Sequence, residues 1–329
     1  MEKTKIKEKG GQKKKQFEFG ITSRLRKKYG NTVLRENKEL YLMMAPVIVL
    51  IFLLAYLPLY GMLIAFQDYF PGAPIFSLGH TKWVGLKFFK QFINGRYFGR
   101  LLKNTLYLSF LNLVIGFPIP IIFALIVNEI KLLKFKKFVQ TASYLPYFIS
   151  TVVVAGIVLS FIGTDGLVND IRAVFGLEPV AFNISVSAFP VIYTVTNVWK
   201  SFGWNSILYL SGMASIDTAL YESAKIDGAN RFQLALHITL PGIMPTISMM
   251  FIMAVGGIMA SNTDLILLLY NPTIYETSDV FGTYIYRDGI LNGNFSLNAA
   301  VGIISSTVNF ILIFVANKIS TKCTGNGMW

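Results

Sequence analysis

Residues 215–241 lie between two apolar stretches and carry acidic, small and turn-forming side chains in a helical order. Asp217 is placed to cap a short helix, and apolar residues recur on one face of that helix. With small residues at Ser223 and Ala224 and one acid, Glu222, the helix could be held in a groove of a soluble partner. An amphipathic loop that packs only on its own protein explains this pattern equally well. The residues alone leave both interpretations open, docking on a partner and packing within the protein.

A turn and a second short helix are expected directly after the first. Asp227, Gly228 and Ala229 should form the turn, because glycine tolerates the left-handed conformation that closes a helix. Asn230 with Gln233 three residues later matches a capping box. Leu240-Pro241 is expected to stop this second helix and to start the next apolar stretch. We therefore predict a helix-turn-helix at a membrane surface.

Two apolar stretches contain side chains that could bind a polar solute. Amide and hydroxyl groups can hydrogen-bond sugar hydroxyls, and indole rings can stack on the apolar face of a sugar ring. Polar groups inside a membrane often mark a transport path, although hydrogen bonds between helices explain many of them. The candidate substrate-path residues are Asn197, Trp199, Ser201, Trp204 and Asn205 in the first stretch, and Ser261, Asn262 and Asp264 in the second.

The sequence argues against an enzyme. It contains no Gly-Lys dipeptide, so the phosphate-binding loop Gly-x4-Gly-Lys-Ser/Thr is absent. Cys323 is the lone cysteine, and His80 and His237 are far apart, so no metal or nucleophilic cluster is expected. We predict no catalytic residue, no metal site and no cofactor in this chain.

The elements that must position these residues are membrane helices. The chain is 53% hydrophobic and only 14% charged, whereas soluble domains carry about a quarter charged residues. A bilayer requires roughly 20 apolar residues for each helical span. We expect an all-α, polytopic membrane bundle with six spans inside residues 41–320, at about 41–66, 104–127, 139–162, 186–213, 246–270 and 297–316. Pro118 and Pro120 should kink the second span.

The distribution of basic residues predicts both termini in the cytoplasm of a bacterial cell. With that orientation, 21 of the 30 Lys and Arg residues lie inside, 8 lie outside, and Lys200 lies within a span. Residues 1–40 form a basic tail, and residues 321–329 form a short C-terminal tail. The basic clusters are not interleaved with aromatic residues, so anionic lipid is the expected partner rather than nucleic acid.

The first outer segment, between the first and second predicted spans, is more basic than this orientation predicts. It contains Lys82, Lys87 and Lys90 together with Arg96, Arg100 and Lys103. Lipid headgroups, an acidic extracellular binding protein or an anionic saccharide could each attract these charges. The sequence leaves these alternatives open.

The segment that begins at Glu222 resembles the signature of binding-protein-dependent ABC importer permeases. That signature reads Glu-Ala-Ala, three residues, Gly, nine residues, Ile-x-Leu-Pro, and this chain has Glu222-Ser-Ala224, Gly228 and Ile238-x-Leu240-Pro241. Asp227-Gly228-Ala229 is similar to the maltose-type, sugar-importing branch. The blocks 117–120, 128–129 and 140–150 resemble the subgroup that serves complex oligosaccharides and polysaccharide fragments. Ser223 replaces the first Ala of the signature, and Asp217 stands where relatives often have Pro.

This resemblance implies a type I permease fold and a passive pore half. In the family, the segment is a coupling helix held in a cleft of a cytoplasmic ATPase, with Glu222 as its anchor and Gly228 at its turn. ATP and Mg would be used by those ATPase subunits. A second homologous permease and an extracellular solute-binding protein are further implied partners. Asn197 and Trp199 are similar to an Asn-x-Trp of maltose-type permeases, whose Asn faces the sugar.

Other functions are weighed against this one. A permease for a solute other than a sugar shares most of these features. An ion-coupled secondary transporter usually has internal repeats and dedicated ionisable sites, and only Asp264 and Lys200 are candidates for such a site here. A membrane scaffold would leave residues 215–241 unexplained. The predicted function is ATP-driven import of oligosaccharides by alternating access.

Overall fold

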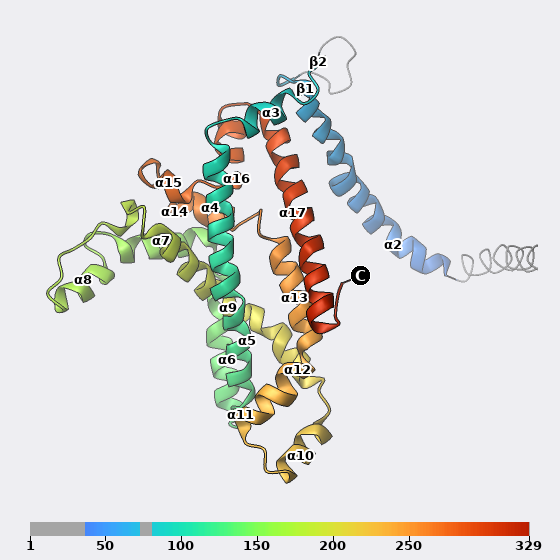
Figure 1. The fold of residues 1–329 in the computed structure, drawn as a ribbon, viewed down its shortest axis with the longest axis vertical. Coiled ribbons are helices and arrows are strands. Elements are labelled where there is room, and N and C mark those ends of the chain that lie inside the picture. Colours follow the sequence, from blue (N-terminus) through green and yellow to red (C-terminus); the bar gives the residue numbers. More distant parts are fainter. Residues whose placement is uncertain (1–36, 73–80, 329) are drawn as a thin grey trace, which may run out of the picture. The chain divides into compact units, whose positions relative to one another are not determined.

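A computed structural model describes residues 37–72 and 81–328. Most of the basic tail that we expect at residues 1–40 lies outside these ranges, as does His80. The described residues are mostly helical, which confirms the all-α membrane fold (Figure 1). The chain divides into two units, residues 1–63 and residues 64–329.

The first unit contains α2 (Lys38–Ile51), and the helix continues in π and 3-10 form through Leu57–Phe66. Together these residues form an apolar helix of 29 residues, which is long enough to cross a bilayer. Its residues from 38 to 59 are all exposed within the chain. A helix that is apolar on every side is expected to lie in lipid or against another membrane protein.

Three long helices form the framework of the second unit. The first contains α4 (Phe98–Leu111), a π-helical turn (Asn112–Gly116) and α5 (Pro118–Asn128). The second is α9 (Phe189–Ala214), and the third is α17 (Phe295–Thr324), which ends at Gly325 in the left-handed conformation. The irregularity expected at Pro118 is the π-helical turn just before it, where the Phe117 N–H bonds the Asn112 carbonyl at 3.1 Å.

Two of the predicted spans are interrupted in the structure rather than continuous. The third is split into α6 (Leu133–Phe148) and α7 (Thr151–Ile162), and the fifth into α13 (Met244–Gly256) and α14 (Thr263–Leu269). In the described residues, four helices are long and apolar enough to span a membrane, namely residues 38–66, 98–128, 151–174 and 295–324. A pair bent by 63°, Arg231–Gly242 with Met244–Gly256, makes a fifth if it is counted as one span. Six such spans are therefore not found in these residues, because α9, the predicted fourth span, is not among the five.

Apolar side chains pack the helices of the second unit into a bundle. α5 and α6 pack against α9, and α13 packs against α17. One buried cluster joins Leu108, Tyr193 and Leu265 from α4, α9 and α14. Another joins Ala124, Tyr209 and Ile243. This packing brings α4, α9 and the broken fifth span together.

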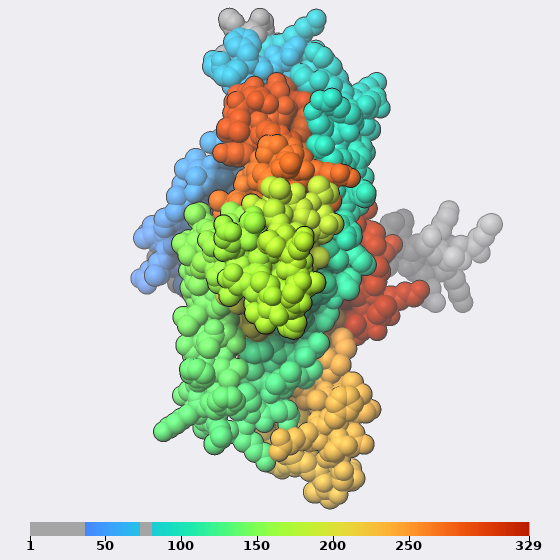
Figure 2. All heavy atoms as spheres, turned by 90° about the vertical axis from the view of Figure 1, so that its left-hand side faces the viewer, coloured from blue at the N-terminus to red at the C-terminus, as the bar shows by residue number. Residues whose placement is uncertain are grey.

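Shorter elements close the two ends of this unit. At one end lie α10 (Thr218–Ile226), α11 (Arg231–Leu234) and α12 (Leu240–Gly242), and at the other lie α3 (Lys87–Ile93) and α16 (Phe281–Tyr284) (Figure 1). A short antiparallel pair of strands, β1 (Gln67–Asp68) and β2 (Lys82–Trp83), lies beside α3. α15 (Tyr275–Ser278) and the π-helical Ile285–Leu291 flank α16. Figure 2 shows α7 and α8 (Leu167–Val174) standing in front of the bundle.

Candidate functional site

A cavity of about 360 Å³ lies among α4, α5, α9 and α13. Its wall is apolar where Met250, Met253 and Phe117 contribute. Polar groups converge on it from three separate stretches of the chain. These groups are Ser109, Asn112, Tyr193, Asn197, Ser201, Asn205, Ser261 and Asn262. A mostly apolar cavity with a few convergent polar groups is the common form of a small-molecule site.

Three asparagine side chains form a hydrogen-bonded relay along this cavity. The Asn262 amide donates to the Asn197 oxygen at 2.9 Å, and the Asn197 amide donates to the Asn112 oxygen at 2.9 Å. The Asn112 amide in turn donates to the Leu108 carbonyl at 3.0 Å. At the other end, the Tyr193 hydroxyl accepts from the Asn262 backbone N–H at 3.0 Å. Because each amide orients the next, the relay holds three helices in one arrangement and presents its remaining donors and acceptors to the cavity.

The break in the fifth span faces the same cavity. Ser261 has φ 44°, the left-handed conformation that non-glycine residues rarely adopt. The Ser109 hydroxyl donates to the Ile258 carbonyl at 2.7 Å and lies 3.3 Å from the Ser261 hydroxyl. An unwound stretch inside a membrane is tolerated where it lines a cavity, because its backbone groups find polar partners there. Strain of this kind is often retained at binding sites.

The structure brings together five of the eight predicted substrate-path residues: Asn197, Ser201, Asn205, Ser261 and Asn262. Trp199 lies on the opposite side of α9, in an apolar hollow with Val195 and Phe202. A step of two residues turns a helix by about 200°, which separates Trp199 from Asn197. Trp204 stacks on Tyr147 at 4.7 Å instead of lining the cavity.

Other outcomes were not anticipated from the sequence. Asp264 is exposed on α14 and is not part of the cavity wall. Ser109, Asn112 and Tyr193 belong to the cavity but were missed. The available signal for Asn112 was an amide side chain inside a predicted span. Only the fold shows that this amide meets Asn197, which is 85 residues away.

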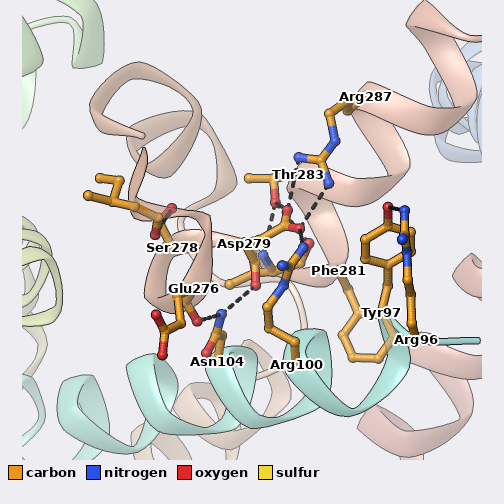
Figure 3. Close-up of polar contacts among 12 residues, drawn as sticks. Arg96, Tyr97, Arg100, Asn104, Glu276, Ser278, Asp279, Phe281, Thr283 and Arg287 are labelled. Carbon is orange, nitrogen blue, oxygen red and sulfur yellow. Dashed lines mark hydrogen bonds and ion pairs between the residues drawn. The ribbon is translucent and has the colours of Figure 1, made fainter. Parts of the chain in front are cut away.

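A second polar cluster, missed by sequence reasoning, is centred on Asp279 (Figure 3). The Asp279 side chain is fully buried, and Arg287 binds both of its oxygens at 3.0 and 2.9 Å. Arg100, on α4, binds the same carboxylate at 2.8 Å, and the Thr283 hydroxyl donates to it at 2.8 Å. Asn104 donates to the Asp279 carbonyl at 3.0 Å. The cluster therefore fastens residues 276–287 to α4.

Arg287 is held in its charged form by this arrangement. Burial by itself lowers the pKa of its guanidinium, but the hydrogen bonds and the negative charge of Asp279 outweigh burial and raise that pKa above its usual value. The Tyr275 ring lies 4.6 Å from the guanidinium and adds a cation–π contact. Arg100 makes a similar contact with Tyr97 at 5.3 Å.

The segment at the opposite end forms the expected helix-turn-helix. The Asp217 side chain caps α10 by accepting from the Ala219 N–H at 3.0 Å, and Gly228 has φ 84°. Asn230 and Gln233 form the capping box through bonds of 2.8 and 2.9 Å. The stop expected at Leu240-Pro241 is confirmed to within one residue, because the helix ends at Gly242 and a bend of 63° separates it from α13, which begins at Met244. Proline has no N–H for the helical hydrogen bond and its ring crowds the preceding turn, which favours a break there.

The residues predicted for docking lie on the surface of this segment. Glu222, Ser223, Asp227 and Gly228 are exposed, and Ala224 and Ala229 are partly buried. Ala224, Asp227, Gly228 and Ala229 line a hollow of about 300 Å³ together with residues of α11. Ile226 and Phe232 are 87% and 74% exposed beside it. Two large apolar side chains are thus left uncovered beside the hollow in this chain.

No group of three or more His, Cys, Asp or Glu side chains within the described ranges is arranged to hold a metal ion.

A sequence profile described as "Binding-protein-dependent transport system inner membrane component" matches residues 92–323. The chain belongs to this family. It is therefore a membrane-embedded permease of a binding-protein-dependent transport system and not an enzyme.

Relatives of the permease cover nearly its whole length. It is 39% identical over 295 residues to the polygalacturonan/rhamnogalacturonan transport system permease protein YteP of Bacillus subtilis, which covers 89% of this chain and 91% of the relative. The arabinooligosaccharides transport system permease protein AraP of the same species is 30% identical, over 87% of this chain and 90% of the relative. A chain in the crystal structure of a bacterial alginate ABC transporter, in complex with an alginate pentasaccharide-bound periplasmic protein, superposes with a TM-score of 0.82. It shares 38% identity and covers 90% of the permease and 99% of that chain.

Proposed function

We propose that this permease is one half of the membrane pore of an ATP-driven importer of oligosaccharides or polysaccharide fragments. The observation that carries the proposal is the cavity at the broken fifth span, where the relay of Asn112, Asn197 and Asn262 offers amide groups to a polar solute. Amides both donate and accept, as sugar hydroxyls do. Relatives named for polygalacturonan, arabinooligosaccharide and alginate transport support a saccharide as the solute.

Conformational changes at this cavity would be driven by the helix-turn-helix at residues 215–241. We propose that α10 docks in a cleft of a cytoplasmic ATPase subunit, with Glu222 as the charged anchor and Gly228 allowing the turn. The exposed side chains of Glu222, Ile226 and Phe232 support a protein contact there. ATP and Mg would be bound by the ATPase subunits, while this chain carries no cofactor of its own.

A chain of contacts connects α10 to the cavity. The Tyr221 hydroxyl lies 3.0 Å from the Thr239 hydroxyl, so α10 is tied to the helix that leads through the 63° bend into α13. α13 ends at the break that carries Ser261 and Asn262. A displacement of α10 would therefore move the cavity wall. That movement would favour either the inward-facing or the outward-facing state of the pore.

The complete importer would contain a second, homologous permease, two ATPase subunits and an extracellular solute-binding protein. The cavity would then be part of a path between the two permeases. Both termini would face the cytoplasm, where the basic residues 1–40 would meet anionic lipid.

The test uses the reconstituted importer in proteoliposomes, with uptake of labelled oligosaccharides and ATP hydrolysis measured together. We expect Asn197→Ala to lower uptake about tenfold while the ATPase subunits still copurify, because it removes two relay hydrogen bonds. Glu222→Arg should abolish copurification of the ATPase and uptake. Glu178→Arg is the matched control, because it makes the same charge reversal at an exposed residue outside residues 215–241, and it should behave like the wild type. An intact uptake rate in the Glu222→Arg importer would disprove ATPase coupling through α10.

A further inference from the structure

Lys200 is a charged side chain in the middle of α9, the predicted fourth span. It is the one charged residue of α9, eleven residues after Phe189 and fourteen before Ala214. These separations correspond to about 16 and 21 Å along the helix, too far for the side chain to reach either end of α9. Its ammonium donates to the Thr151 hydroxyl at 2.7 Å. The four ion pairs of the described residues involve other side chains, so no carboxylate there lies within 4 Å of Lys200.

A lysine without a counter-charge is costly in lipid and is expected to face a polar path. The helical phase of α9 places Lys200 between two faces of that helix. At about 100° per residue, Lys200 lies about 60° from Asn197 and about 100° from Trp199 around the helix axis. Asn197 lines the cavity and Trp199 lies in the apolar hollow, whereas Lys200 and Trp204 line neither. Lys200 therefore lies outside the cavity of the asparagine relay, about one helical turn along α9 from Asn197.

A second positive element lies beside this lysine. Thr151 is the first residue of α7, and the Ser150 side chain caps that helix by accepting from the Val153 N–H at 3.3 Å. The N-terminus of a helix carries a partial positive charge and unused N–H donors. The ammonium of Lys200 thus meets the positive end of α7, and no acidic side chain in the described residues neutralises the pair.

Aromatic rings lie about one helical turn from Lys200 along α9. Trp204 and Tyr147 are stacked with their centroids 4.7 Å apart and their planes within 5°, and Phe148 meets Trp204 edge-on at 5.4 Å. Trp204 is 39% exposed and Tyr147 is 42% exposed, so both keep ring surface open in this chain. A fixed cation next to an open indole is suited to a ring that carries a carboxylate, because the ring stacks while the charge is paired.

We infer that Lys200, together with the N-terminus of α7, is a carboxylate-recognition site in the transport path, and that the substrate is an oligosaccharide containing uronic acids. This inference rests on the proposed function and specifies its substrate class. Trp204 stacks on the sugar ring, Lys200 pairs with its carboxylate, and the asparagine relay contacts the hydroxyl groups.

The test compares two matched probes in the reconstituted importer with its binding protein. One is a galacturonate trisaccharide, and the other is the same trisaccharide with its carboxyl groups reduced; alginate and arabinan trisaccharides extend the acidic and the neutral set. Uptake by each variant is divided by wild-type uptake of the same probe, which cancels the preference of the binding protein. Lys200→Met should lower acidic uptake about tenfold or more and leave neutral uptake within about twofold. Lys200→Arg should restore most acidic uptake, and Lys318→Met, on α17, is the control.

Three outcomes separate this inference from the proposed function. A wild-type importer that takes up neutral but not acidic probes overturns the inference and leaves the oligosaccharide importer intact. An equal loss of acidic and neutral uptake in the Lys200→Met importer also overturns it. That result would mean that Lys200 pairs with an acidic residue of the second permease and supports assembly of the importer. Failure of the wild type to import any saccharide overturns the proposed function itself.

Discussion

Replacing Asp279 by asparagine should destabilise the permease more than any exposed charge substitution. The carboxylate of Asp279 is fully buried and is the common partner of Arg100 and Arg287. The substitution would keep the size of the side chain but remove its negative charge. Two guanidinium groups, 33% and 24% exposed, would then lie together without compensation.

The magnitude follows from burial and geometry. Removing one partner of a fully buried ion pair costs about 3–5 kcal/mol. The partial exposure of both arginines lets water screen their charges, so we expect about 3 kcal/mol for Asp279→Asn. Arg100→Met should cost less, because Arg287 still binds both carboxylate oxygens at 3.0 and 2.9 Å. The exposed pair of Lys87 and Asp68, 3.4 Å apart, should contribute under about 1 kcal/mol.

Thermal unfolding of the purified importer measures these differences. At about 2 °C or more for each kcal/mol, Asp279→Asn should lower the Tm by about 6 °C, whereas Lys87→Met should shift it by less than about 2 °C. Assembly with the ATPase, measured by copurification, shows whether the variant still forms the complex. A Tm of the Asp279→Asn importer within about 1 °C of the wild type would refute the view that this carboxylate fastens residues 276–287 to α4.

Two further predictions concern glycines. A Cβ at Gly203 would overlap the backbone carbonyl of Ser143. Gly203→Ala should therefore force α6 and α9 apart and lower the Tm by about 5 °C or more. Gly156 has open space around it, so Gly156→Ala should leave the Tm unchanged or higher. Equal Tm values for the two variants would contradict the close approach of these helices. Gly228 has φ 84° and open space around it, so Gly228→Val should distort the turn and reduce ATP-coupled uptake, while Gly228→Asn should be milder because asparagine tolerates this conformation. Unchanged coupling in Gly228→Val would show that the turn is not needed.

Local features of the sequence predicted much of the helical framework. The cap at Asp217, the turn at Gly228 and the capping box at Asn230 each depend on bonds between residues two or three positions apart, or on a single backbone conformation. Apolar length predicted the membrane class for the same reason, since each span satisfies its own backbone hydrogen bonds. Such features can be predicted from sequence because no distant residue takes part in them.

The tertiary structure decided which polar side chains act together. Asn197 bonds partners 85 and 65 residues away, and Asp279 bonds Arg100 across 179 residues. These pairings depend on how α4, α9 and the broken fifth span pack, which no local pattern encodes. The same packing separated Trp199 from the cavity and interrupted the fifth span at Ser261, where Ser109 and Tyr193 bond the backbone at the break. The sequence alone therefore determined a membrane permease with a helix-turn-helix at residues 215–241, and the packing of its helices determined which residues line the cavity.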